Sequence, residues 1–329
     1  MEFTAEIKKA TEPIYRKISK AVPEIEWATP APYIFKINQL KKEKNAVILA
    51  HNYQTPEIYH GISDFSADSL ALAVEAAKTK ADIIVMCGVH FMAETAKLMS
   101  PEKKVLLPDM RAGCSLSSSI TGKDVRDLKN KYPGVPVVSY VNTSADVKAE
   151  TDVCCTSANA LKIVKSLGVK KVIFLPDDYL AKYVASQTDV EIISWKGTCE
   201  VHEQFNDEEI NEIRKNNPGI KIIAHPECPP DVIKASDFAG STSGMIKYVK
   251  DNQPEKVMMV TECSMSDNVQ IDNPNVKFIR PCNLCPHMKR ITLPKILDCL
   301  ENETNEILMS DETIEKARKS VERMTKIGR

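Results

Sequence analysis

Three short groups of polar residues recur along the chain, and each directly follows an apolar run. The groups are His51-Asn52-Tyr53 after residues 47–50, Tyr140-Val141-Asn142 after residues 137–139, and His225-Pro226-Glu227 after residues 222–224. Side chains of these types bind anions and transfer protons. An aspartate follows twelve or thirteen residues after the first polar residue, and a hydroxyl residue five residues after that aspartate: Asp64 and Ser69, Asp152 and Ser157, Asp237 and Thr242. We therefore expect three similar units with polar side chains at equivalent corners.

Each copy ends on a cysteine that follows a strand-like run and a Gly or Pro turn. These cysteines are 85 residues apart from 114 to 199 and 86 residues apart from 199 to 285: Cys114, Cys199 and Cys285. Equivalent corners could bring the three thiols together. Three thiolates without a fourth favour an iron–sulfur cluster over structural zinc, which takes four protein ligands. An iron left open by such a cluster would be a Lewis acid suited to dehydration or elimination.

Other uses of these cysteines remain open from the residues alone. Zinc could be bound instead, with His202, His225 or His287 completing the site. The Cys282-Asn283-Leu284-Cys285 segment is a CxxC pattern, which could be a dithiol switch. The other cysteines lie in apolar or irregular contexts and are expected to be buried small hydrophobic residues: Cys87, Cys154, Cys155, Cys228, Cys263 and Cys299.

The elements that position these residues alternate between strands and helices. Short apolar runs rich in β-branched residues, such as 81–86, 171–175 and 256–260, are typical of strands buried on both faces. Amphipathic stretches between them, 69–78, 157–167 and 242–250, begin at Ser or Thr and carry helical spacing. The order predicts an α/β fold of three small units with short parallel sheets. Ligands bind outside the carboxyl ends of such strands, where the polar groups lie.

The repeat also predicts the organisation of the chain. We expect an N-terminal helical segment, three αβα repeats and a C-terminal helical segment, with bounds 1–35, 36–120, 121–205, 206–290 and 291–329. Pro-Gly pairs at 133–134 and 218–219 end a helix just before a first strand.

Composition excludes several classes of protein. The formal net charge is −1 without a long basic run, so nucleic acid is not an expected partner. No apolar stretch approaches the roughly 20 residues that span a bilayer, and the N-terminus lacks the apolar core of a signal peptide. We expect a soluble cytoplasmic protein with reduced cysteines.

Six motifs in order resemble the quinolinate synthase (NadA) family over about residues 45 to 290: Ala50-His51-Asn52-Tyr53-Gln54, Gly88 to Lys97, Ala112-Gly113-Cys114-Ser115, Val201-His202-Glu203, His225-Pro226-Glu227-Cys228 and Cys285-Pro286-His287-Met288-Lys289. The resemblance implies three αβα domains in pseudo-threefold order around one [4Fe-4S] cluster. It implies that iminoaspartate condenses with dihydroxyacetone phosphate, with loss of phosphate and two waters, to give quinolinate for NAD biosynthesis. It also implies a separate enzyme that supplies iminoaspartate.

By motif position, the resemblance implies that Cys114, Cys199 and Cys285 hold the cluster. The positions that match the family's active site are His51, Tyr53, Ser69, Tyr140, Asn142, Ser157, His202, His225, Glu227, Ser241 and Thr242.

Within this set, the acid–base candidates are Glu227, Tyr53, Tyr140 and His225, with Glu227 foremost. His51 and His225 could bind carbonyl or phosphate oxygens, and Asn142 could orient a carboxylate or hydroxyl. The hydroxyls that open the predicted helices could bind anions or simply cap the helices. A zinc-dependent hydrolase or aldolase and a redox sensor without catalysis are the alternative classes.

Overall fold

The computed structural model describes residues 1–280 and 283–328, and the predicted α/β fold is confirmed. The strands form three parallel four-stranded sheets. The first sheet has the order β2-β1-β3-β4: β1 (Ala46–His51), β2 (Phe65–Ala67), β3 (Ile83–Cys87) and β4 (Lys104–Leu106). The second has the order β6-β5-β7-β8: β5 (Val137–Tyr140), β6 (Val153–Cys155), β7 (Lys171–Leu175) and β8 (Glu191–Ser194). The third has the order β10-β9-β11-β12: β9 (Lys221–Ala224), β10 (Phe238–Ala239), β11 (Lys256–Val260) and β12 (Lys277–Ile279).

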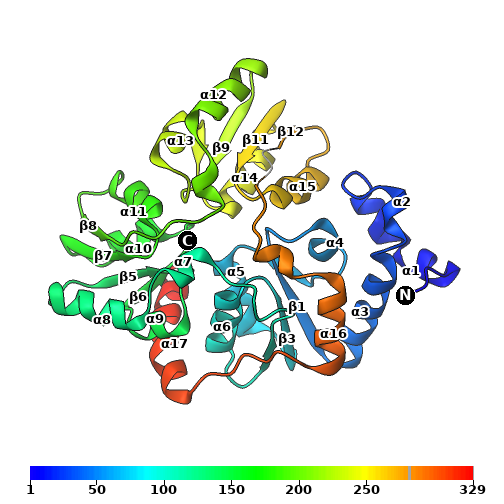
Figure 1. Ribbon diagram of the computed structural model, residues 1–329, viewed down its shortest axis with the longest axis horizontal. Coiled ribbons are helices and arrows are strands. Elements are labelled where there is room, and N and C mark those ends of the chain that lie inside the picture. The colour runs from blue at the N-terminus through cyan, green and yellow to red at the C-terminus, as the bar shows by residue number, and fades with distance from the viewer. Residues whose placement is uncertain (281–282, 329) are drawn as a thin grey trace. The chain divides into compact units, whose positions relative to one another are not determined.

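The chain divides into two compact units, which are described separately. Unit 1 comprises residues 1–112, 263–274 and 284–307 and contains the first sheet. Its helices are α1 (Ala5–Ile18), α2 (Glu24–Trp27), α3 (Ala31–Glu43), α4 (Pro56–Tyr59), α5 (Ser69–Lys78), α6 (His90–Met99), α15 (Cys263–Asp272), η2 (Met288–Arg290) and α16 (Leu293–Asn302). Helix α16, drawn in orange, lies alongside α3 (Figure 1).

Unit 2 comprises residues 113–262, 275–283 and 308–329 and contains the second and third sheets. Its helices are α7 (Ser115–Ser118), α8 (Gly122–Lys131), α9 (Ala145–Ala149), α10 (Ala160–Ser166), α11 (Asp178–Ala185), η1 (His202–Gln204), α12 (Asp207–Asn216), α13 (Pro230–Ala235), α14 (Thr242–Asn252) and α17 (Asp311–Ile327). Helix α17, drawn in red, packs against α9 and β6 (Figure 1). The bounds of the three predicted repeats stay a prediction.

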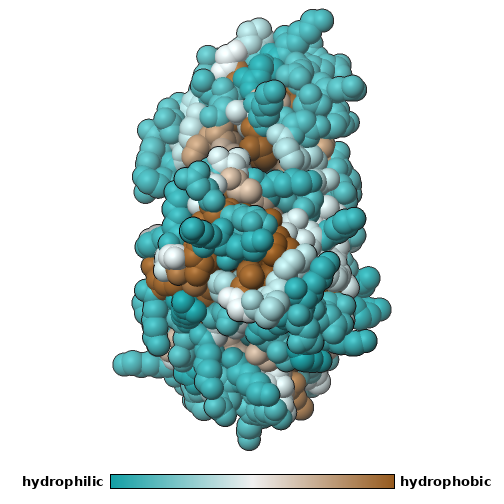
Figure 2. All heavy atoms as spheres, turned by 90° about the vertical axis from the view of Figure 1, so that its left-hand side faces the viewer, coloured by the Kyte–Doolittle hydropathy of each residue, from teal (hydrophilic) through white to brown (hydrophobic). Residues whose placement is uncertain are grey.

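The inner strands of the sheets, β1, β3, β5, β7, β9 and β11, are largely buried, whereas the edge strands β2, β8 and β10 have no buried residue. All five residues of β3 are buried, as expected for a continuous apolar strand of a parallel sheet. Figure 2 shows one face of the molecule, on which hydrophilic side chains predominate and hydrophobic ones gather in separate patches. Within the described ranges, no helix has both the length and the apolarity needed to cross a membrane.

The repeated aspartates have a structural role that the sequence pattern did not reveal. The carboxylate oxygens of Asp64, Asp152 and Asp237 accept hydrogen bonds of 2.8, 2.7 and 2.8 Å from the backbone amides of Ile48, Val137 and Ile222. In each case the aspartate lies just before one strand and its partner lies in the neighbouring strand. One carboxylate therefore fixes the register of one pair of parallel strands in every sheet.

The starts of the three predicted helices differ in detail from the expectation. Helices α5 and α14 begin at Ser69 and Thr242 as predicted. The helix expected from Ser157 begins at Ala160 instead, because the Asn159 side chain accepts a 2.8 Å hydrogen bond from the Thr156 amide and forms a turn first.

The capping alternative for Ser69, Ser157 and Thr242 is wrong, because other residues occupy the N-cap positions. The capping residues are Asp68, Asn159 and Ser241, of which Asp68 and Ser241 accept a hydrogen bond from a first-turn amide. The three repeated hydroxyls are therefore not the caps of these helices.

Candidate functional site

In each of the three copies, an aspartate holds the backbone amide of one strand residue. The polar residues follow this strand residue at the same spacing along the chain. His51, Tyr140 and His225 come three residues after Ile48, Val137 and Ile222, whose amides the aspartates hold. Tyr53, Asn142 and Glu227 come five residues after the same anchors. Each of β1, β5 and β9 therefore presents a pair of polar side chains at its carboxyl end, as the sequence predicted.

In unit 2, Glu227 is the centre of a buried polar cluster. The residue is 4% exposed, and the Tyr140 hydroxyl donates a short hydrogen bond to its Oε1 atom. His202 Nδ1 lies 3.0 Å from Oε2, and His225 Nδ1 lies 3.7 Å from Oε1. The two imidazole rings are 4.9 Å apart between centroids. Three of the four predicted acid–base candidates, Tyr140, His225 and Glu227, thus lie together.

Two further residues hold the imidazole rings in place. The hydroxyl of Thr261, which directly follows β11, lies 2.9 Å from His202 Nε2. The Ser157 hydroxyl lies 3.1 Å from His225 Nε2. Since both contacts occupy Nε2, each ring turns its Nδ1 atom towards the Glu227 carboxylate. Ser157 is therefore a partner of His225 rather than a helix cap.

The electrostatics of the cluster favour an ionised Glu227. Burial raises the pKa of this carboxyl, but the positive charges of His225 and His202 and hydrogen bonds from His202 and Tyr140 outweigh it, so the pKa lies well below its ordinary value. Asp177 behaves in the opposite way, because burial and then the negative charge of Glu227 raise its pKa well above the ordinary value. The pKa values of these two buried carboxyls are therefore shifted in opposite directions, that of Glu227 downwards and that of Asp177 upwards.

Cys199 and Cys114 lie on adjoining loops of unit 2. The Ser115 hydroxyl donates to the Thr198 carbonyl at 3.2 Å and accepts from the Glu200 amide at 3.1 Å, so it contacts both neighbours of Cys199. Burial, the charge of Glu227 and the nearby Cys114 raise the pKa of Cys199 well above its ordinary value. A thiol in this setting ionises readily only when a metal cation compensates the charge. The donor set of unit 2 therefore fits two ligands of the predicted cluster.

The predicted hydroxyl residues of unit 2 border a cavity of about 360 Å³. Ser157 and Ser241 line it, together with Gly240, Gly244 and Tyr183. Ser241 is 7% exposed, and Thr242 follows it as the first residue of α14. Backbone amides at the start of this 11-residue helix and nearby hydroxyls suit a phosphate or carboxylate group.

Asn142 has a buried acceptor that the described residues leave unused. Its Oδ1 atom is inaccessible to solvent and has no hydrogen-bond partner among the described residues. A buried amide oxygen without a partner costs about 1–3 kcal/mol, which a bound ligand with a donor group would recover. This supports the predicted role of Asn142 in orienting a substrate.

The remaining predicted residues belong to unit 1. His51 is 5% exposed, and its ring contacts that of Tyr53 edge to face at 4.6 Å. Ser69 is partly buried at the start of α5, and Cys285 is partly buried in the segment 284–307. Cys282, the other cysteine of the CxxC pattern, lies outside the described residues.

Among the cysteines predicted to be buried fillers, Cys87, Cys154, Cys155, Cys228 and Cys299 are buried, and Cys263 is partly exposed.

Thr261 and Asp177 were not predicted from the sequence, and both lie just beyond the third strand of a repeat. Thr261 follows β11, and Asp177 comes two residues after β7 and caps α11 with its Oδ1 atom, 2.9 Å from the Leu180 amide. Both are fully buried polar residues. The sequence pattern could have indicated both residues. The repeat that places polar residues after β1, β5 and β9 also aligns the residues that follow β3, β7 and β11.

Comparisons with known proteins match almost the whole chain. The family model described as Quinolinate synthetase A protein matches residues 35–326. A quinolinate synthase of Sinorhizobium fredii is 60% identical over 327 residues, which is 99% of this chain and 91% of that relative. A quinolinate synthase of Caulobacter vibrioides is 57% identical over 326 residues, or 98% of this chain and 89% of the relative. One from Xylella fastidiosa is 59% identical over 291 residues, or 88% of this chain and 86% of the relative. The similarity therefore includes both units.

Proposed function

The chain belongs to the quinolinate synthetase A family, and on that premise we propose that it condenses iminoaspartate with dihydroxyacetone phosphate. Its function is that of a quinolinate synthase in NAD biosynthesis. In the proposed reaction the two substrates join through one C–C bond and one C–N bond, and one phosphate and two water molecules leave. The atoms then balance to quinolinate without an oxidant or a reductant. The observation that carries this proposal is the buried cluster in which Glu227 contacts Tyr140, His202 and His225.

Proton transfers are the part of this reaction that the cluster suits. Condensation and dehydration each need a base that removes a C–H proton and an acid that protonates a departing oxygen. Glu227 is ionised and so can accept a proton, while Tyr140 and His225 are in contact with it and can pass protons on. The fourth predicted catalytic residue, Tyr53 of unit 1, is proposed to act on the same substrates.

Substrate binding is assigned to the polar residues around this cluster. Ser157, Ser241 and Thr242 suit the phosphate group, since two of them line the cavity at the start of α14 and Thr242 begins that helix. The unused Oδ1 atom of Asn142 suits a hydroxyl or imine N–H group. His202 and, from unit 1, His51 and Ser69 are proposed to hold carboxylate and carbonyl oxygens.

We propose that Cys114, Cys199 and Cys285 hold a [4Fe-4S] cluster. The adjoining loops of Cys114 and Cys199 support two of the three ligands. When bound, such a cluster supplies a Lewis-acidic iron that polarises a carboxylate or a departing hydroxyl. The protein's own contribution is to keep this chemistry in a buried site and to supply the protons.

A single divalent cation such as Zn²⁺ is the alternative occupant. One ligand atom each from Cys199, His202 and Glu227 lie within 4.8 Å of one another. Such a site would take mixed sulfur, nitrogen and oxygen ligands without Cys114 or Cys285. It would favour a hydrolase or aldolase over the condensation proposed here.

Anaerobic reconstitution with iron and sulfide, followed by an assay of quinolinate formation from the two substrates, tests the proposal. We expect a brown protein with about four iron and four sulfide per chain. Alanine at each proposed ligand should abolish the visible absorbance, and alanine at the matched buried controls Cys87 and Cys299 should leave it intact. A colourless, air-stable protein that binds one zinc would favour the alternative. Retained absorbance in a ligand variant would exclude that cysteine as a ligand.

Two proposals concern the protein's surroundings. Iminoaspartate hydrolyses in water, so an enzyme that oxidises an amino acid to this imine is the proposed source. The proposed location is the cytoplasm, where reduced thiols persist.

A further inference from the structure

Three consecutive backbone carbonyls of unit 1 are held by side chains that belong to distant parts of the chain. They belong to Asn52, Tyr53 and Gln54, which directly follow β1. Asn268 of α15, which is 2% exposed, donates to the Asn52 and Gln54 carbonyls at 3.2 and 2.7 Å. Lys289 Nζ donates to the Tyr53 carbonyl at 2.9 Å. Three successive peptide groups are thus fixed in orientation, and with them the direction of the Tyr53 side chain.

Lys289 also belongs to the turn that begins at Cys285. Its backbone amide donates to the Cys285 carbonyl at 3.1 Å, and its ammonium group donates to the Ser264 hydroxyl at 2.6 Å. The Gln54 side chain approaches the Met288 carbonyl at 3.5 Å, which adds a weaker link between the same two segments. The Lys289 ammonium group therefore attaches the loop that carries Tyr53 to the turn that carries Cys285.

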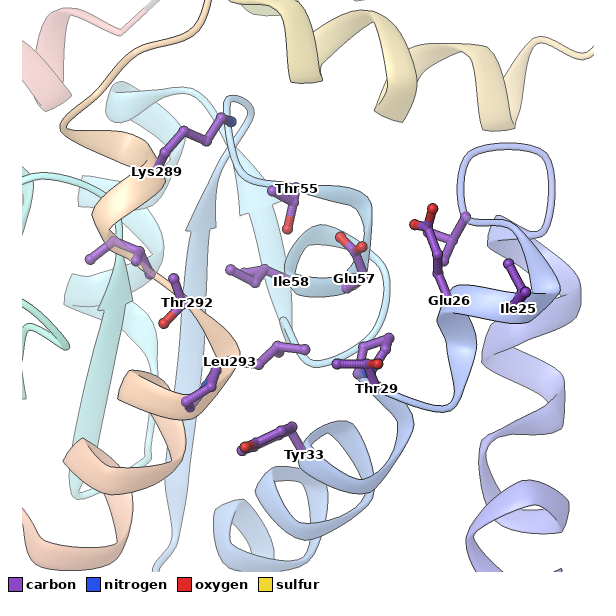
Figure 3. A pocket seen from close by; sticks show the side chains of 14 residues that line it. Ile25, Glu26, Thr29, Tyr33, Thr55, Glu57, Ile58, Lys289, Thr292 and Leu293 are labelled. Carbon is purple, nitrogen blue, oxygen red and sulfur yellow. The ribbon is translucent and has the colours of Figure 1, made fainter. Parts of the chain in front are cut away.

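A cavity lies next to the Tyr53 loop, beside Thr55 and Lys289. Lys289 and Thr55 border a cavity of about 560 Å³, whose walls include Ile58 of α4, Tyr33 of α3 and Leu293 of α16. Figure 3 shows Lys289 and Thr55 at one end of this cavity and Tyr33 at the other. Side chains do not fill this space, so on this side the segment next to the loop is held by polar contacts rather than by packing.

We propose that Lys289 is a positioning residue that couples the Cys285 turn to the Tyr53 loop. The inference rests on the proposed function, because it takes Cys285 as a cluster ligand and Tyr53 as an acid–base group. When Cys285 is ligated, its turn is held, and the Lys289 ammonium holds the Tyr53 peptide in the orientation that catalysis needs. When Cys285 is unligated, the loop moves more freely. The site would thus be assembled only in a chain that has its metal group.

The amides of the loop provide a readout that does not require activity. Those of Asn52, Tyr53 and Gln54 donate to the Ala67 carbonyl, the His51 ring nitrogen and the His51 carbonyl respectively. Hydrogen exchange at these three positions therefore measures how often the loop opens. Hydrogen bonds from charged donors are strong enough that loss of one should raise the opening rate about tenfold or more.

The test compares Lys289→Met and Lys289→Arg with the control Lys41→Met in the full chain. Lys41 is matched, because its ammonium group also donates to one carbonyl, that of Ile62 at 2.6 Å, and one side chain, that of Asp64 at 2.8 Å. In metal-free protein, Lys289→Met should speed exchange at residues 52–54 about tenfold, Lys289→Arg less so, and Lys41→Met should leave it unchanged. Reconstitution with iron and sulfide should slow this exchange in the parent protein but not in Lys289→Met.

Turnover then separates the inference from the function on which it rests. Lys289→Met should lower kcat about tenfold or more with little change in KM, and Lys289→Arg should restore part of it. Equal exchange at 52–54 in Lys289→Met and Lys41→Met would overturn the inference, and so would unchanged exchange in the parent on reconstitution. Normal turnover in Tyr53→Phe would instead remove the proposed role of Tyr53 and leave the exchange results standing.

Discussion

His60 should make unit 1 less stable as the pH falls towards 4. This residue is the C-cap of α4, and its ring contacts that of Tyr59 edge to face at 4.6 Å between centroids. Its Nε2 atom is buried and has no hydrogen-bond partner among the described residues. Burial, and secondly the positive charge of Lys17, lower the pKa of His60 from 6.5 to about 4, although Asp272 and the backbone of Asn268 act in the opposite direction. The folded protein therefore resists protonation of this ring.

The sign and size of the effect follow from proton linkage. Between pH 6.5 and about 4 the unfolded chain binds a proton at His60 that the folded chain does not. The stability that the folded protein gains from keeping His60 neutral is therefore complete above pH 6.5 and is lost as the pH falls towards 4. At about 1.4 kcal/mol per pKa unit, the full shift of the His60 pKa corresponds to about 3.5 kcal/mol. Since the ring is partly exposed, we expect about 2 kcal/mol.

The assay is urea unfolding between pH 7.5 and 4.5, with fluorescence of Trp27 as the probe of unit 1. Trp27 is 4% exposed, and Trp195 of unit 2 is replaced by Phe so that only unit 1 is observed. His60→Phe keeps a ring against Tyr59 but cannot be protonated. Its free energy of unfolding should fall about 2 kcal/mol less than that of the parent over this range. Parallel pH profiles for the two proteins, or a pKa near 6.5 for His60 by NMR titration, would show that His60 does not cause the loss of stability.

Three further outcomes are expected. Glu227→Gln should retain the cluster absorbance and lower kcat by about 10²- to 10⁴-fold, and near-normal turnover would remove its acid–base role. Asp152→Ala should lower the free energy of unfolding by about 1–2 kcal/mol in urea titrations, because a strand amide loses its charged acceptor; an unchanged midpoint would show that the anchor is dispensable. Gly197 lies two residues before Cys199, and a Cβ atom at this position would lie 2.6 Å from the Pro176 carbonyl oxygen. Gly197→Ala should therefore displace this loop and lower the iron content after reconstitution. Full iron loading in this variant would show that the loop adjusts without loss of the site.

The sequence predicted the features that depend on short-range patterns. The buried strands and the polar pairs after β1, β5 and β9 could be read directly, because apolar runs and the residues after them are contiguous in the chain. The start of α10 could not be predicted in this way, because the turn formed by Asn159 and Thr156 competes with the helical pattern that begins at Ser157.

Residues whose role depends on a distant partner were out of reach. Nothing near Asp64 in the chain indicates that its carboxylate holds the Ile48 amide, sixteen residues earlier. In the same way, Lys289 and Asn268 meet the Tyr53 loop across more than 200 residues of chain. A lysine in a polar segment is usually a solvated surface residue, so composition gives no reason to single it out.

The aspartate anchors separate the task of folding from the task of chemistry within each strand. Each anchored amide lies three residues, or about 10 Å, from the first polar residue at the strand's carboxyl end. Mutations at the tip could therefore be explored over evolutionary time without disturbing how the strands align. The same carboxylate anchor thus serves strands whose tips carry His with Tyr, Tyr with Asn or His with Glu.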